Sequence, residues 1–177
     1  MADFNIVIAG FGGQGLLFSG KVLAYAGLLE GRELSWLPSY GPEMRGGTAN
    51  CNVILSDTPV GSPIVEHPNV LMVMNEPSLD KYEDAVVPGG KIFIDSTLIT
   101  RKVERSDVEV FYVPATKLAN DMGVPTLANM ILTGTLVEKT GCVKFESIPD
   151  ALHKVIPARK ADLFDVNMKA VDMGRQA

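Results

Sequence analysis

A glycine-rich segment near the start of the chain is the first place where residue types and spacing could do chemistry. Residues 10–15 (GFGGQG) match the pattern G-x-G-x-x-G, directly after an apolar run and before a helical pattern. Glycines permit a tight turn, and the free N–H groups at a helix N-terminus attract an anion. The candidate residues of this first loop are Gly10, Gly12, Gly13, Gln14 and Gly15.

The second half of a dinucleotide-binding fingerprint is missing. Such a site needs an Asp or Glu at the end of the second strand, about 20 residues on, to hold the ribose hydroxyls. Here that strand would end in residues 35–38 (SWLP), and Glu30, Arg32 and Glu33 all precede it or begin it. Three interpretations remain: a tight structural turn, an anion cradle such as one for a CoA phosphate, and a true dinucleotide site, which fits least.

The second loop, residues 39–47 (SYGPEMRGG), is the most specific segment in the chain. Its glycines and proline restrict the backbone, and its polar residues offer a phenol, a carboxylate and a guanidinium. An arginine in such a loop suits a carboxylate or phosphate. Ligand contact, contact with a partner subunit and an internal Glu43–Arg45 pair all stay open. The candidate residues of this second loop are Tyr40, Glu43, Arg45, Gly46 and Gly47.

The elements that must position these loops alternate between strand and helix. Residues 4–9 read as a strand buried on both faces, and residues 16–30 as a helix with Gly31 as its C-cap. Further strands are predicted at residues 33–37, 48–55, 58–64, 70–74, 91–95 and 109–113, and further helices at 76–86, 115–122, 126–140, 148–155 and 162–173. This order predicts an α/β fold: a three-layer sandwich around a mostly parallel sheet, with a Rossmann-like first strand-loop-helix unit and one domain over residues 1–177.

Several single residues have local interpretations. Asn75 is predicted to cap the helix that follows it, with Pro77 at its first position. Thr126 and Asn129 open a helix, where capping is favoured over contact with a partner. The two histidines, His67 and His153, are isolated in the sequence and are predicted to be surface or packing residues.

Composition excludes several classes of protein. A net charge of −5 argues against nucleic-acid binding, and the basic residues Arg101, Lys102 and Arg105 sit beside acids, as in a solvated loop. Cys51 and Cys142 are too few for a zinc site or an iron–sulfur cluster, and we predict two buried thiols. No run reaches the roughly 18 apolar residues of a membrane span, and the start lacks a basic signal region, so we expect a cytoplasmic protein.

Both glycine-rich loops, together with residues 48–57 (TANCNVILSD) and 61–65 (GSPIV), resemble the gamma subunits of 2-oxoacid:ferredoxin oxidoreductases. The resemblance covers residues 4–173, is strongest over 6–64, and is closest to the 2-oxoglutarate type, with pyruvate and ketoisovalerate enzymes as relatives. It implies an oxidoreductase complex that converts a 2-oxoacid, CoA and oxidised ferredoxin into acyl-CoA, CO₂ and reduced ferredoxin.

The resemblance also implies where the cofactors belong. Such a complex is expected to use thiamine diphosphate, Mg²⁺, 4Fe–4S clusters and CoA. This chain shows neither the Gly-Asp-Gly pattern of a thiamine diphosphate site nor cluster cysteines, so these groups are expected on alpha and beta subunits, with a delta subunit as a further option. The two loops would then border the CoA approach or the seam between subunits, and the isolated chain could self-associate. The alternatives are a free-standing nucleotide- or phosphate-binding α/β module and a non-catalytic assembly protein.

Overall fold

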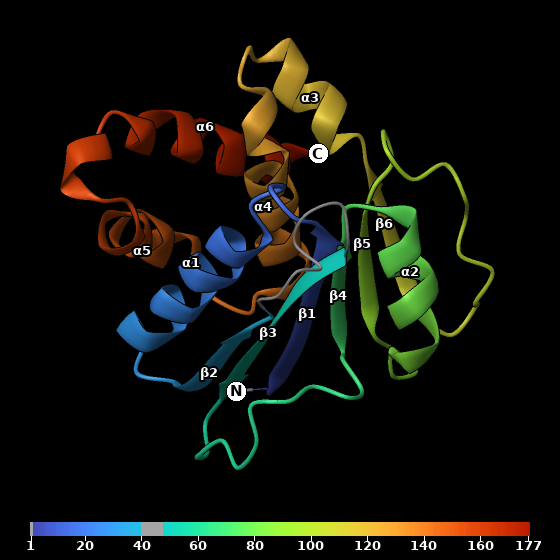
Figure 1. The fold of residues 1–177 in the computed structure, drawn as a ribbon. Coiled ribbons are helices and arrows are strands. Elements are labelled where there is room, and N and C mark those ends of the chain that lie inside the picture. Colours follow the sequence, from blue (N-terminus) through green and yellow to red (C-terminus); the bar gives the residue numbers. More distant parts are fainter. Residues whose placement is uncertain (1, 40–47) are drawn as a thin grey trace.

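A six-stranded sheet forms the centre of the molecule in a computed structural model that describes residues 2–39 and 48–177 (Figure 1). The strands are β1 (Phe4–Phe11), β2 (Glu33–Pro38), β3 (Thr48–Ser56), β4 (Val70–Val73), β5 (Lys91–Asp95) and β6 (Glu109–Val113). They lie in the order β2-β3-β1-β4-β5-β6. The pairs β1–β4, β4–β5 and β5–β6 are parallel, whereas β3 runs antiparallel to both β1 and β2. The prediction of a mostly parallel sheet is confirmed, with β3 as one reversed strand.

Helices cover both faces of this sheet, but unequally. They are α1 (Leu16–Leu29), α2 (Glu76–Tyr82), α3 (Ala115–Asp121), α4 (Ala128–Thr140), α5 (Ile148–Val155) and α6 (Leu163–Gln176). Figure 1 shows α1, α4, α5 and α6 on one side of the sheet and α2 on the other. Each side has its own apolar cluster, so the three-layer sandwich is confirmed.

The first strand shows why the sequence forms this architecture. Ile6 and Ile8 are fully buried against the side that carries α1 and α4, while Val7 and Ala9 are fully buried against the side that carries α2. Successive side chains of a strand point to opposite faces, so a strand covered on both faces must be apolar throughout. The buried strand predicted from residues 4–9 is therefore confirmed.

Helices α4 and α6 pack against each other through glycine. A β-carbon added at Gly134 would fall on the carbonyl oxygen of Val171, and one added at Gly174 would fall on that of Ile131. The Thr135 hydroxyl also donates a hydrogen bond to the carbonyl oxygen of Gly174 at 2.7 Å. The two backbones thus touch without intervening side chains, which holds α6 directly on α4.

Three element predictions, at residues 58–64, 76–86 and 126–140, need correction. The helix predicted over 76–86 ends as α2 at Tyr82 and is followed by a 3₁₀ turn, Glu83–Ala85. No strand forms over 58–64, where the chain is an irregular, mostly exposed loop. Pro59 and Pro63 lack the N–H group that a strand ladder needs. The helix predicted from residue 126 begins as a 3₁₀ turn, Pro125–Leu127, and becomes regular as α4 at Ala128.

The cap at the start of α2 was predicted correctly. The Asn75 side chain accepts a hydrogen bond from the N–H group of Ser78 at 3.0 Å. Pro77 occupies the second position of the helix rather than the first, because α2 begins at Glu76. A proline is tolerated there because the first N–H groups of a helix have no intrahelical acceptor.

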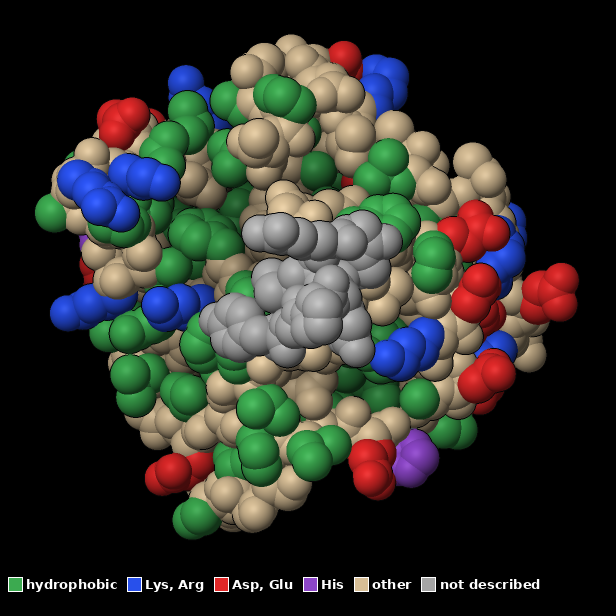
Figure 2. Space-filling view, in the orientation of Figure 1, with side chains coloured by type: hydrophobic (Ala, Val, Ile, Leu, Met, Phe, Trp, Pro, Cys, Tyr) green, Lys and Arg blue, Asp and Glu red, His purple; other side chains and the backbone are tan. Residues whose placement is uncertain are grey.

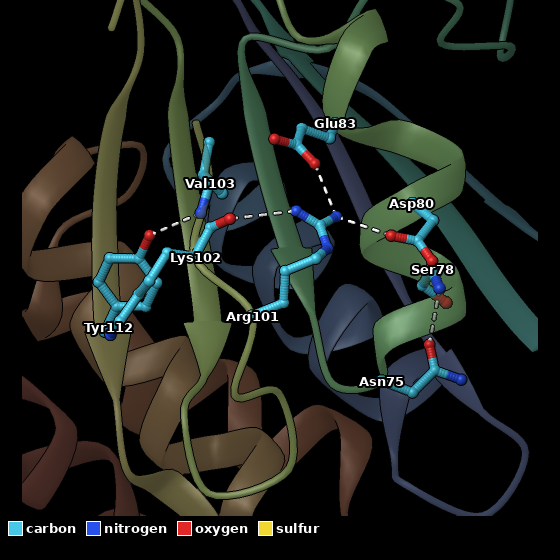
Figure 3. A network of polar contacts seen from close by, with 8 residues as sticks. All are labelled: Asn75, Ser78, Asp80, Glu83, Arg101, Lys102, Val103 and Tyr112. Carbon is cyan, nitrogen blue, oxygen red and sulfur yellow. Dashed lines mark hydrogen bonds and ion pairs between the residues drawn. The ribbon is translucent and has the colours of Figure 1, made fainter. Parts of the chain in front are cut away.

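Two of the basic residues in the partly exposed loop near position 101, Arg101 and Arg105, make a network of polar contacts, and Figure 3 shows that of Arg101. The Arg101 guanidinium donates to a carboxylate oxygen of Asp80 and to one of Glu83, each at 2.7 Å. Arg105 donates to the backbone carbonyl oxygens of Glu83 and Val86 at 2.8 Å. The prediction of a solvated loop beside acids is confirmed, and these side chains in addition fasten the segment between β5 and β6 to α2 and the turn after it.

Candidate functional site: the carboxyl edge of the sheet

The first glycine loop lies at the carboxyl end of β1 and is filled by its own glutamine. The Gln14 Oε1 atom accepts a hydrogen bond from the N–H group of Phe11 at 2.6 Å, and its Nε2 atom donates to the carbonyl oxygen of Met74 at 3.0 Å. A β-carbon at Gly10 would fall on Gln14 Oε1. The side chain therefore closes the turn and ties it to the end of β4.

Gly15 ends the loop, and its carbonyl oxygen accepts a hydrogen bond from Asn129 of α4. Its φ angle of 77° is left-handed, and it occupies the N-cap position of α1. Asn129 Nδ2 donates to the Gly15 carbonyl oxygen at 3.0 Å and to the Ser19 hydroxyl at 3.2 Å. A β-carbon at Gly15 would lie 2.5 Å from that nitrogen, so both the backbone angle and the close approach require glycine here.

The prediction that Asn129 caps its own helix is therefore wrong. α4 begins without a side-chain cap, and Thr126 lies exposed in the preceding 3₁₀ turn. Asn129 instead joins two segments more than a hundred residues apart in the chain. The one sequence signal for this role is a single amide in an otherwise apolar stretch, residues 128–132 (ANMIL).

The remaining loop glycines lie toward the outside. Gly13 is exposed with a φ angle of 89°, and Gly12 is half-buried. The acids weighed for ribose binding are remote from them. Glu33 begins β2, which runs parallel to β1, so it lies at the amino edge of the sheet. Glu30 accepts a hydrogen bond from the N–H group of Lys144. This arrangement favours the structural-turn interpretation over the dinucleotide site.

The residues predicted in the second loop, Tyr40, Glu43, Arg45, Gly46 and Gly47, lie outside the described residues. Their flanks are placed. β2 ends at Pro38, the N–H group of Ser39 donates to the Asn50 carbonyl oxygen at 2.8 Å, and β3 begins at Thr48, which pairs with Phe11 of β1. Both ends of the second loop therefore meet the sheet at the edge that carries the first loop (Figure 1). The roles predicted for its residues stay predictions.

Sequence reasoning missed a buried carboxylate at the same edge. Asp95 ends β5 and is fully buried. Its oxygens accept hydrogen bonds from the Thr116 hydroxyl at 2.5 Å and from the N–H groups of Thr116 and Thr97 at 3.3 and 3.2 Å. A buried charge needs such partners. Because its oxygens are engaged with the start of α3, Asp95 has a structural role here.

The two cysteines are buried free thiols, as predicted. Cys51 lies on β3 and Cys142 follows α4. Burial raises the pKa of Cys51 to about 12 and that of Cys142 to about 11. Within the described residues, no cluster of His, Cys, Asp or Glu could hold a metal ion. None of the helices described here is both long enough and apolar enough to cross a membrane.

Comparison with known proteins places this architecture in a family. The family described as pyruvate ferredoxin/flavodoxin oxidoreductase matches residues 5–177. The ketoisovalerate oxidoreductase subunit VorA of Methanothermobacter thermautotrophicus is 41% identical over 98% of this chain, which spans only 36% of that relative. The 2-oxoglutarate synthase subunit KorC of Methanocaldococcus jannaschii is 35% identical over 86% of this chain and 83% of its own length.

Solved structures have the same fold. The gamma subunit of a keto/oxoacid ferredoxin oxidoreductase from Geobacter sulfurreducens PCA superposes with a TM-score of 0.83 at 30% identity, covering 98% of this chain and 96% of that one. A 2-oxoglutarate:ferredoxin oxidoreductase from Magnetococcus marinus reaches a TM-score of 0.89 over 99% of this chain and 31% of that one, at 22% identity. The resemblance drawn from the two loops is confirmed, and the chain belongs to the pyruvate ferredoxin/flavodoxin oxidoreductase family.

Proposed function

We propose that this chain is the gamma-type subunit of a 2-oxoacid:ferredoxin oxidoreductase, with 2-oxoglutarate as the substrate. The observation that carries the proposal is the family match over residues 5–177. The choice of 2-oxoglutarate rests on KorC, of which the chain spans 83%, whereas it spans about a third of VorA. A single domain over residues 1–177 and a cytoplasmic location stay predictions.

In the proposed complex, the cofactors lie on other chains. Thiamine diphosphate with Mg²⁺ would support decarboxylation, 4Fe–4S clusters would pass electrons to ferredoxin, and CoA would take the acyl group. Alpha and beta subunits, and a delta subunit where present, would hold them. The two cysteines of this chain support the assignment of the iron–sulfur clusters to other subunits. Thiolates are the metal-binding form, and the pKa of both Cys51 and Cys142 is raised by burial.

The two glycine loops would line the approach of CoA or the seam between subunits. Support comes from the shared edge of the sheet, where the first loop and both flanks of the second loop meet. Open α/β sheets place their ligands at the carboxyl ends of the strands. The alternative of a free-standing nucleotide-binding module is not favoured, because Gln14 fills the first loop and the acids that could bind a ribose lie elsewhere.

A surface formed by α1 and β2 supports the proposal of partner subunits. A hollow of about 270 Å³ lies between these elements and is lined mainly by Tyr25, Leu28, Leu34 and Trp36. Leu28 is 56% exposed, and β2 is one of the two edge strands of the sheet. Figure 2 shows hydrophobic side chains over these elements at the left of the view. Exposed apolar groups beside an open strand edge are typical of an interface.

The occupant proposed for this α1–β2 surface is another subunit of the complex. VorA, in which the matching region is about a third of the polypeptide, shows that a relative carries this region joined to further chain. In the absence of its partners, the same surface would let the isolated chain self-associate.

The test is an anaerobic pull-down of the tagged chain from its native cells, with assay of the eluate. The proposal expects co-purified chains that bear thiamine diphosphate and iron–sulfur clusters, and ferredoxin reduction that depends on CoA and is fastest with 2-oxoglutarate. A chain that elutes alone and carries a nucleotide would overturn it.

Substitution of Arg45 separates the two roles left open for the second loop. Lost turnover in an intact Arg45→Ala complex would indicate ligand contact, whereas loss of the complex would indicate subunit contact. Arg159→Ala, in an exposed 3₁₀ turn, is the matched control and should change neither the turnover nor the assembly of the complex.

A further inference from the structure

The outer side of β2 carries backbone groups that face away from the sheet. Among the described residues, β2 pairs with β3 alone, in antiparallel register (Figure 1). The Ser39 N–H group donates to the Asn50 carbonyl oxygen at 2.8 Å, so the odd-numbered residues at this end of the ladder face β3. In an antiparallel pair the residues between turn their N–H and C=O groups the other way. Leu34 and Trp36 therefore direct their backbone groups outward.

These outward groups match what an added strand needs. Leu34 and Trp36 each offer one N–H donor and one C=O acceptor, which would support about four backbone hydrogen bonds. The next outward position is Pro38, which has no N–H group, so the donors end at Trp36. Residues 34–36 carry no charge. The free part of the edge is thus short and uncharged in its middle.

The other edge strand of the sheet, β6, is better protected. The Lys139 ammonium lies 5.9 Å from the ring centroid of Phe111, and that of Lys102 lies 3.9 Å from the ring centroid of Tyr112. Phe111 and Tyr112 are successive residues of a strand, so these lysines guard opposite faces. The Val103 N–H group also donates to the Tyr112 hydroxyl at 2.9 Å, which ties the preceding loop to the strand. Lysines and covering loops are how native sheets block strand addition, so β2 is the edge suited to it.

The α1–β2 hollow described above lies on one face of this same edge. The side chains of Leu34 and Trp36 line it together with Tyr25 and Leu28 of α1. Side chains two positions apart in a strand share a face. A strand added to β2 would therefore direct every second side chain over the hollow, where a large apolar side chain would bury the exposed apolar groups.

Lys21 adds a charge at one end of the hollow. Its ammonium lies 5.7 Å from the ring centroid of Trp36, and it forms no ion pair within the described residues. A carboxylate on the added strand would complement this charge. Since Leu34 and Trp36 are two positions apart, the carboxylate belongs two positions from the apolar side chain. The β2 strand of a second copy of this chain carries no carboxylate on that face, which favours a different subunit as the occupant.

We propose that another subunit of the complex adds an extended segment to β2. The segment pairs with the backbone of Leu34 and Trp36, places an apolar side chain in the hollow, and sets a carboxylate beside Lys21. Main-chain hydrogen bonds provide affinity in this mode of recognition, and pockets for alternate side chains provide specificity. The inference rests on the proposed function and names how the partner binds.

Residue-resolved hydrogen–deuterium exchange tests the pairing. It compares the full-length chain, at a concentration where it sediments as a monomer, with the complex purified anaerobically. The amides of Leu34 and Trp36 should exchange at least about tenfold more slowly in the complex, whereas those of Ser35 and Leu37 face β3 and should be protected in both samples. Unchanged exchange at Leu34 and Trp36 in an intact complex would overturn strand addition and leave the proposed function standing. A chain that co-purifies with no other subunit would overturn the proposed function as well.

A pair of variants at one position separates the backbone from the side chain. Leu34→Ala and Leu34→Pro both remove the apolar side chain, but only proline removes the outward N–H group, and proline is tolerated where that group faces solvent. Recovery of partner subunits by the tagged chain should fall about tenfold further for Leu34→Pro, the effect of roughly one hydrogen bond. Equal recovery would contradict the pairing. Thermal unfolding checks that both variants are folded, and the exchange pattern decides the question if Leu34→Pro is not.

Lys21→Gln tests the predicted carboxylate. It should lower the recovery of partner subunits, and more strongly at low than at high salt, because added salt screens the ion pair. Lys154→Gln, exposed on α5 and outside the hollow, is the matched control and should leave the recovery unchanged. The same recovery with both variants would overturn the predicted contact with Lys21.

Discussion

Gln14 and Asn129 decide the shape of the first glycine loop, although neither is a glycine of the motif. Gln14 joins the N–H group of Phe11 to the carbonyl oxygen of Met74, and Asn129 holds the carbonyl oxygen of Gly15. Hydrogen bonds thus connect the loop to the end of β4 on one side and to α4 on the other. At this scale, single hydrogen bonds determine whether the turn stays closed.

Gln14→Glu should destabilise the fold in a pH-dependent way. The change replaces the donor to the Met74 carbonyl oxygen with a charged acceptor, so we expect a loss of about 1 to 3 kcal/mol in the free energy of unfolding at pH 7.5. The repulsion raises the pKa of the new carboxyl in the folded state. The protonated form can donate, so the stability is present at low pH and is lost as the pH rises.

Urea unfolding of the Gln14→Glu variant and the parent chain at pH 4.5 and 7.5 measures this difference. Gln176→Glu, at an exposed helix end, is the control and should stay near the parent at both values. An equal loss at both pH values would show that the Nε2 contact is unimportant.

The two thiols should be inert in the folded chain. Because burial raises the pKa to about 12 for Cys51 and about 11 for Cys142, neither forms a thiolate near pH 8. We expect Ellman's reagent to label neither thiol in the native chain and both after unfolding. If the thiols of the native chain react as fast as those of the unfolded chain, the two cysteines are not buried.

The same thiols predict a loss of stability in alkali. In the unfolded chain a thiol ionises near pH 8.5, whereas in the folded chain it stays protonated until about pH 11 or 12. A group whose pKa is raised on folding contributes stability below its unfolded pKa, and that contribution falls as the pH rises toward the folded value. The free energy of unfolding should decrease between pH 8 and 10.5, and less steeply in Cys51→Ala than in the parent chain.

At the scale of elements, the contact between α4 and α6 determines how α6 is attached to the rest of the fold. Gly134 and Gly174 let the two backbones meet, and the Thr135 hydroxyl adds one hydrogen bond across the contact. Since α4 also carries Asn129, this packing supports the glycine loop.

Gly134→Ala should separate the two helices. Its β-carbon would fall on the Val171 carbonyl oxygen, a backbone atom that cannot rotate away, so we expect a loss of about 3 kcal/mol. Thermal or urea unfolding measures this loss. Gly61→Ala is the matched control, because nothing lies within 4 Å of a β-carbon there. Equal stability of the two variants would show that α6 moves aside without cost.

At the scale of the whole molecule, the exposed α1–β2 surface is the one proposed to bind another subunit. Leu28 on this surface and Leu98 in the turn after β5 are similarly exposed, at 56% and 45%. They lie on different parts of the molecule, so they allow a matched comparison. The comparison tests assembly and not folding, because exposed side chains contribute little to stability.

Leu28→Lys should block assembly and Leu98→Lys should not. We expect both isolated chains to unfold within about 0.5 kcal/mol of the parent. The yield of co-purified partner subunits should fall strongly for Leu28→Lys alone, since a lysine ammonium would have to lose its hydration in an apolar interface. Equal yields from both variants would place the interface elsewhere.

The amino-acid sequence by itself determined most of the elements, the cap at Asn75, the position of the first glycine loop and the family. These features depend on near neighbours: apolar periodicity, turn residues and capping side chains act over a few positions. The tight turn could be predicted because Gly10 to Gly15 follow a buried strand directly. The roles of Tyr40, Glu43 and Arg45 stay predictions.

Only the tertiary structure decided which distant segments meet. It placed β3 as a reversed strand between β2 and β1, joined Asn129 to Gly15, and fastened Arg101 to α2. It also left residues 58–64 without a partner strand. Pairings of this kind depend on the packing of the whole core, and a hydrogen bond between residues far apart leaves no periodic trace in the sequence. That is why capping was the wrong prediction for Asn129.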